Sequence, residues 1–248
     1  MKTSGAIEFD FLGTNEGAVN LIRLRHAYLK LASERVEWLM GQYWHPMFVP
    51  ECFPMVMSWG ASVPVHVLSR NPQLRFTYKP SEKISLMTSI LSQRDFVSSG
   101  PDGNSSEYLK NSQIPEVQFQ LMTKPSEKLI AGFTAGYKTL VPRLVTDSNY
   151  VYKETISSYN FNLFSRYIGD KFDLKLQGIY GQNLNSLLLI GGYAVSEINQ
   201  QYDQRKYVNL HTFSVWTELI FKLNSIKLGL FAAYTKNLGA QEDFNLNQ

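Results

Sequence analysis

Acidic and basic side chains occupy alternate positions near the start of the chain. Glu8 and Asp10 are separated by one apolar residue, and so are Arg23 and Arg25. Successive side chains of a β-strand point to opposite faces, so each pair shares one face of its strand. Two carboxylates on one strand and two guanidinium groups on the next could form ion pairs, or could create a field that orients a dissolved solute. These four residues are the first functional candidates.

Metal, cofactor and nucleic-acid chemistry have little support in the sequence. A metal site from His45, His66 and Cys52 is conceivable, with Glu51 as a fourth ligand, but these spacings match no familiar ligand pattern. A single cysteine excludes an internal disulfide framework. The net charge of +3 is small, and no Lys/Arg cluster of the kind that follows a phosphate backbone is present. We therefore predict no metal, no cofactor and no nucleic-acid partner.

Two further histidines fall on expected strands. His211 lies near Ser214, but the two positions have opposite strand parity, so the side chains would point to different faces instead of forming a nucleophile–base pair. By the same count His26 and Tyr28 fall on the face opposite Arg23 and Arg25. We expect a buried, hydrogen-bonded His26 rather than a catalytic one, and no enzymatic activity.

The elements that must position these residues are strands. The chain has 248 residues, of which 13% are aromatic and 18% charged, and no apolar stretch reaches the ~18–20 residues of a spanning helix. Most segments alternate apolar and polar residues, which predicts strands with one apolar and one polar face. About eleven can be placed, over residues 5–12, 19–31, 34–44, 73–79, 83–95, 115–123, 128–141, 154–168, 171–182, 209–223 and 226–237.

The connections between these strands are of two kinds. Short polar turns near residues 33–34, 80–82, 125–127, 169–170 and 224–225 alternate with long connections around 45–72, 96–114, 143–152 and 183–208. Short turns at one end and long loops at the other are typical of a transmembrane up-and-down antiparallel β-barrel in a bacterial outer membrane. The first residues lack an apolar signal segment, and eleven strands is an odd number for such a barrel. We expect residues 1–248 to be a single β-barrel domain cut at both ends.

Loop 45–72 is unusually apolar for a solvated connection. Its only charges are Glu51 and Arg70, and it contains Phe48, Phe53, Met55, Met57 and Trp59. Because free water would not favour such a surface, something must cover it. We expect the loop to fold inward and narrow the barrel; a subunit contact or a short plugging helix is the alternative.

Three segments carry a resemblance to a known family. They are Gly5-Ala6-Ile7-Glu8-Phe9-Asp10-Phe11, the run Ile22-Arg23-Leu24-Arg25-His26-Ala27-Tyr28, and Met40-Gly41-Gln42-Tyr43-Trp44-His45-Pro46. In order and spacing they resemble bacterial outer-membrane general porins, and among these the DcaP-like porins. The resemblance is clearest over about the first 80 residues. It implies that the first three strands correspond to the family's third to fifth strands of a 16-stranded barrel.

The resemblance also implies a constriction in the lumen, with Arg23, Arg25 and Arg75 as its basic side. A charge that faces lipid at mid-membrane costs about 2–4 kcal/mol, so Glu8, Asp10 and the arginines should face inward. We expect the pore lining to include Glu8, Asp10, Arg23, Arg25, Arg75, Glu51 and Arg70. The alternative is a structural ion-pair network along the wall.

The predicted function is therefore passive diffusion of small hydrophilic solutes through an outer-membrane porin, in contact with outer-membrane lipid. By resemblance alone, the assembly would be a homotrimer. Two alternatives stay open: an outer-membrane barrel enzyme, which would need a polar dyad at the rim, and a soluble all-β binding protein, which would place its apolar face inward.

Overall fold

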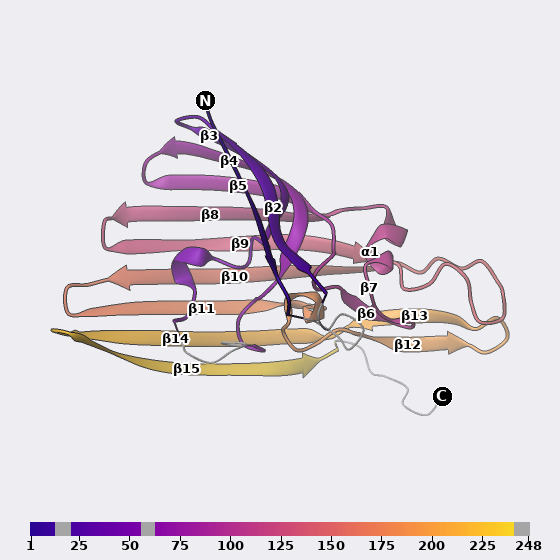
Figure 1. Ribbon diagram of the computed structural model, residues 1–248. Coiled ribbons are helices and arrows are strands. Elements are labelled where there is room, and N and C mark those ends of the chain that lie inside the picture. The colour runs from indigo at the N-terminus through magenta and orange to yellow at the C-terminus, as the bar shows by residue number, and fades with distance from the viewer. Residues whose placement is uncertain (13–20, 56–62, 241–248) are drawn as a thin grey trace.

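A computed structural model describes residues 1–12, 21–55 and 63–240. Eleven strands form one antiparallel sheet in which every strand pairs with its neighbours along the chain, so the topology is an up-and-down meander (Figure 1). The strands are β1 (Lys2–Asp10), β2 (Arg23–Ala32), β3 (Val36–Trp44), β4 (Arg70–Ser81), β5 (Ile84–Leu91), β8 (Glu116–Ser126), β9 (Leu129–Leu140), β10 (Ile156–Ile168), β11 (Phe172–Gln182), β14 (His211–Leu223) and β15 (Ile226–Gly239).

The eleven predicted strands are confirmed, and the long loops contain further elements that the sequence pattern missed. The loop after β5 holds the hairpin β6 (Ser98–Gly100) and β7 (Gly103–Ser105) and the helix α1 (Glu107–Ser112). The loop after β11 holds the 3₁₀ turn η3 (Asn185–Leu187) and the hairpin β12 (Tyr193–Asn199) and β13 (Gln204–Asn209). These segments are short and rich in polar and turn residues, so their periodicity is weak. Positions 19–20 of the second predicted strand lie outside the described residues.

The two ends of the sheet differ as expected. Turns of two or three residues join β2 to β3, β4 to β5, β8 to β9, β10 to β11, and β14 to β15, and all of them lie at one end. The connections after β5, β9 and β11 lie at the other end, whereas residues 45–55 after β3 extend over the sheet (Figure 1). This loop is shorter than predicted because β4 begins at Arg70, where it pairs with Trp44.

The sheet curls, so that β1, β2 and β3 turn over the face on which the 3₁₀ turn η2 (Pro50–Cys52) lies (Figure 1). Among the described residues β1 pairs only with β2, and β15 only with β14. Closure of the barrel and a total of sixteen strands therefore stay predictions.

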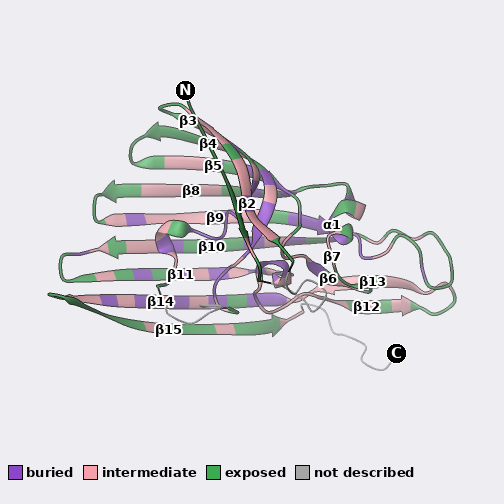
Figure 2. Cartoon of the chain, viewed as in Figure 1, coloured by how far each residue is buried: buried purple, intermediate pink, exposed green. Residues whose placement is uncertain are grey.

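The two faces of the sheet have the predicted polarity. Phe119, Leu174 and Leu228 on the outer face are 39%, 39% and 52% exposed, whereas Gln118 on the inner face is fully buried (Figure 2). Other inner-face residues are buried and polar as well: Thr134, Ser158, Asn160, Asn162, Gln177 and Ser214. A soluble sandwich or barrel would bury its apolar face instead. The sheet thus presents apolar side chains outward and hydrophilic ones inward, as membrane barrels do.

One prediction about faces is wrong. Glu8 pairs with His26 and Phe9 pairs with Leu24, so Arg25 is an extra residue on β2. A bulge of this kind shifts the alternation by one residue. His26 therefore lies on the inner face, where it is 6% exposed and its ring centroid is 5.0 Å from that of Trp44. Tyr28 follows it inward and meets the Tyr43 ring edge-on at 4.9 Å.

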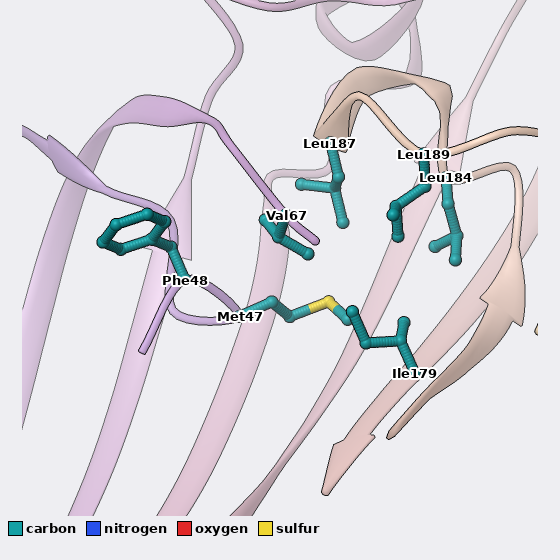
Figure 3. Packing of buried hydrophobic residues seen from close by; sticks show 7 residues of the cluster. All are labelled: Met47, Phe48, Val67, Ile179, Leu184, Leu187 and Leu189. Carbon is teal, nitrogen blue, oxygen red and sulfur yellow. The ribbon is translucent and has the colours of Figure 1, made fainter. Parts of the chain in front are cut away.

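The largest apolar cluster lies between the loops and the inner wall. Met47, Phe48 and Val67 come from segment 45–69 and share this cluster with Ile179 of β11, which lies next to the end of the Met47 side chain (Figure 3). The loop after β11 completes the cluster with Leu184, Leu187 and Leu189. Met47, Phe48 and Val67 are thus covered by the protein's own interior.

Candidate functional site

A chain of ion pairs crosses the inner face of β1 and β2 near the loop end of the sheet. Arg23 lies 2.6 Å from Asp10, and Arg25 lies 2.8 Å from Glu8 and 3.3 Å from Asp10. The bulge at Arg25 allows both arginines to reach carboxylates on β1. The four charged residues predicted from the alternation, Glu8, Asp10, Arg23 and Arg25, therefore lie in one ion-pair network.

The same chain of charges continues into the loops through a residue that the sequence reasoning missed. Asp95, which follows β5, lies 2.7 Å from Arg70 and 3.8 Å from Arg23, and it is only 4% exposed. The Arg70 guanidinium also lies over the Trp44 ring, 5.0 Å from its centroid. Three arginines thus face three carboxylates, and the network as a whole is neutral. Nothing in the local sequence around Asp95 signals this contact, which joins segments 25 residues apart.

Arg75 does not join this network. Its guanidinium donates to the Trp44 carbonyl at 2.7 Å and to the side-chain oxygen of Gln73 at 3.0 Å, and it lies over the Tyr43 ring. The three arginines expected to form one basic side are therefore separated into a paired set, Arg23 and Arg25, and a cation that has neutral hydrogen-bond acceptors.

The described parts of segment 45–69, residues 45–55 and 63–69, lie along the inner face and are bonded to it by side chains of the wall. On the way in, the carbonyl of Pro46 accepts a hydrogen bond from Gln120 of β8, and that of Met47 accepts one from Asn162 of β10. At η2, Arg166 of β10 donates to the Glu51 carbonyl at 3.1 Å. These contacts pass successively from β8 to β10.

The returning part of the segment is bonded to the next two strands. The Ser214 hydroxyl of β14 donates to the Val65 carbonyl at 2.8 Å, and His66 Nδ1 lies 2.7 Å from the Gln177 side-chain oxygen of β11. The described parts of the loop therefore lie against β8, β10, β11 and β14. Met57 and Trp59, which contributed to the predicted apolar loop, lie outside the described residues.

Cavities border the described part of the loop on its other side. One, of about 240 Å³, lies between Pro46–Glu51 and the wall of β2 to β5, where Lys30, Glu37 and Arg75 line it. The other, of about 250 Å³, lies at the turn end and is lined by Lys79, Lys83 and Lys124. Both cavities include Glu51, Lys79, Ser85 and Met122 in their walls, so they adjoin each other.

The remaining reactive groups have structural partners. The Ser214 hydroxyl is engaged by the loop, whereas His211 contacts Tyr180 and Gln182. Burial raises the pKa of the Cys52 thiol to about 12, which keeps it protonated. In the described ranges no three His, Cys, Asp or Glu side chains gather closely enough to hold a metal ion. No described helix is long and apolar enough to span a membrane.

A curled meander with an apolar outer face, a polar inner face and a loop folded against the inside has the architecture of an outer-membrane β-barrel. One solved structure supports this fold. The chain is similar to the crystal structure of the outer membrane channel DcaP of Acinetobacter baumannii, with a TM-score of 0.69 and 17% identity, over 94% of this chain and 62% of that one. The predicted resemblance to DcaP is confirmed at the level of the fold, and this chain spans less than two thirds of the length of its structural neighbour.

Two structures of OmpT, an outer-membrane protein of Vibrio cholerae, match with TM-scores of 0.45 and 0.44, at 11% and 8% identity, over 96% and 93% of this chain and 80% and 73% of those chains. No protein-family model and no curated protein sequence matches the chain.

Proposed function

We propose that the chain forms the wall of a passive diffusion channel in a bacterial outer membrane, with no catalytic role. Small hydrophilic solutes would cross inside the barrel, outer-membrane lipid would cover the apolar face, and three copies would assemble, as the sequence resemblance implies. The observation that carries the proposal is the placement of segment 45–69. It lies against β8 to β14 and leaves adjoining cavities with charged walls along β2 to β5.

The chemistry of those walls suits water-filled transport. Lys30 and Lys79 lie 3.0 and 3.8 Å from Glu37, so fixed charges of both signs line the same passage. Charged and hydrogen-bonding groups on a pore wall replace part of a solute's hydration and discriminate by charge and size. In the cavity beside β2 to β5, Arg75 and Glu51 are the two lining charges without an ion pair among the described residues. They are therefore expected to affect ion preference most.

Planar bilayer recordings on the full-length protein test the proposal. Arg75→Ala should move the reversal potential in a salt gradient toward cation preference, and Glu51→Gln should move it toward anions. Leu176→Ala on the outer face is the matched control and should leave it unchanged. Absence of discrete conductance steps from well-folded protein, or an identical reversal potential in all three variants, would contradict the proposal.

A further inference from the structure

We propose that Lys175 and Glu218 act together as a clamp that positions residues 53–55 of the loop and thereby sets the width of the passage beside β2 to β5. The inference rests on the proposed function for its effect on transport, but the clamp itself can be tested without any measurement of transport.

The clamp consists of two oppositely charged side chains on adjacent strands of the inner wall. Lys175 of β11 and Glu218 of β14 are direct partners in the strand register. The Lys175 Nζ lies 2.7 Å from Glu218 Oε2, and the side chains are 3% and 2% exposed. Two charges removed from water in this way need further hydrogen bonds to offset their lost hydration.

Those further hydrogen bonds go to the loop backbone at Phe53 and Met55. Lys175 Nζ donates to the Phe53 carbonyl at 2.6 Å, and Glu218 Oε1 accepts from the Met55 N–H at 2.6 Å. One carbonyl and one N–H, two residues apart, are therefore held by a matching donor and acceptor on the wall. Because the contacts are to the backbone, they constrain the path of the chain, while the Met55 side chain itself is 71% exposed.

These contacts differ from most others that hold the loop. Gln120, Asn162 and Gln177 are neutral amides, and each bonds a loop carbonyl. Hydrogen bonds to charged groups are roughly twice as strong as neutral ones. Arg166 is also charged, but it reaches a single carbonyl, that of Glu51. Lys175 and Glu218 together bring charges of both signs to the loop backbone at Phe53 and Met55.

The position of residues 53–55 affects the passage because residues 50–55 lie between the clamp and the cavities. Pro50 and Glu51 line the cavity beside β2 to β5, and Phe53 and Met55 are held by the clamp on the opposite side. If residues 53–55 leave β11 and β14, the neighbouring Pro50 and Glu51 can move into the cavity that they line. Release should therefore narrow the passage and make its conductance fluctuate.

A charge-swapped variant separates a clamp from a merely structural ion pair. Lys175→Glu combined with Glu218→Lys keeps an ion pair across β11 and β14, but it turns an acceptor toward the Phe53 carbonyl and a donor toward the Met55 N–H. Amide hydrogen exchange of Met55 and of residues 46–54 in the full-length protein should accelerate roughly ten- to hundredfold, the loss expected for a hydrogen bond to a charged group. Strand amides of β11 and β14 should keep their protection.

Two further variants complete the test. Lys175→Met with Glu218→Leu removes the charges without burying an unpaired one. If the swapped chain does not fold, this apolar pair provides the same test, and its loop amides should also exchange faster than those of the wild type. The matched control is the swap of Lys128 and Asp170, an ion pair 3.0 Å long whose side chains are 50% and 87% exposed on the turn rim; it should change neither exchange nor conductance. Wild-type protection of the loop in the swapped or the apolar pair would overturn the clamp, and a released loop with unaltered conductance steps would overturn its effect on the width of the passage. Absence of discrete conductance steps in the wild-type protein would count against the channel instead.

Discussion

The Nε2 atom of His45 lies 2.9 Å from Oε1 of Glu116, and neither side chain is more than 4% exposed. The pair joins the first residue after β3 to the first residue of β8, which are 71 positions apart. Gln118 donates to the same carboxylate oxygen at 2.8 Å. Through His45, Glu116 therefore holds the start of segment 45–69 against the wall at the loop end of the sheet.

Glu116→Ala should destabilise the protein by about 3 kcal/mol, because the substitution leaves buried polar groups on His45 and Gln118 without their acceptor. Urea unfolding of the protein in lipid vesicles, followed by tryptophan fluorescence, measures the change. Glu107→Ala serves as the control, since Glu107 is 60% exposed in its ion pair with Lys110 and should alter stability by less than about 1 kcal/mol. Equal losses in the two variants would exclude a special role for Glu116.

The double variant Arg23→Ala/Arg25→Ala should shift the channel toward cations. In the native protein Arg23, Arg25 and Arg70 balance Glu8, Asp10 and Asp95, and the substitutions leave two carboxylates in excess. The reversal potential of the full-length protein in a salt gradient reports the shift, which should be larger at low ionic strength because salt screens partly exposed charges. An unchanged ion preference would mean that the network is structural and remote from the solute path.

Contact between the loops at residues 141–155 and the β12–β13 turn should be lost in strong acid. Burial acts to raise the pKa of Asp203, but hydrogen bonds from Arg143, the Asp147 N–H and Arg205 outweigh it and lower this pKa to about 2. A carboxylate with a depressed pKa contributes stability above its ordinary value of 3.8, and that contribution is lost as the pH falls through about 2. Hydrogen exchange of loop 141–155, measured between pH 5 and pH 2, should show rising exposure relative to the strands.

The control for that prediction is Asp203→Asn, which removes the titrating group and keeps a side chain of similar size. In this variant the loop contact should already be weakened at pH 5, and its remaining protection should no longer depend on pH in this range. A native-like acid response in Asp203→Asn would assign the titration to another carboxylate.

Leu176→Arg should reduce stability in a lipid bilayer by about 2–4 kcal/mol, the cost of an arginine on the lipid-facing side near mid-membrane. Leu176 is 48% exposed on the outer face of β11, between the inward-facing Lys175 and Gln177. Unfolding in vesicles measures the cost, with Leu176→Phe as the size-matched apolar control. A neutral result for Leu176→Arg would indicate that this face meets water or protein.

Much of the architecture follows from local patterns in the sequence. Alternation of the kind seen at Phe119 and Leu174 needs only the geometry of a single strand, and the two classes of connection depend on nearby turn residues. For this reason the eleven strands, the polarity of their faces and the likeness to DcaP could all be predicted. The charged candidates Glu8, Asp10, Arg23 and Arg25 were found through the same two-residue period.

Other features depend on which distant segments meet, and no local pattern encodes that. The extra residue at Arg25 exists only relative to the partner strand β1, and it turns His26 and Tyr28 inward against their parity. Asp95 and Glu218 acquire their roles because folding brings Arg70 and the loop backbone to them. The alternation of apolar and polar residues in a strand depends only on that strand's own side chains. A bulge, an ion-pair partner or a docked loop is instead selected by the free energy of the whole assembled sheet.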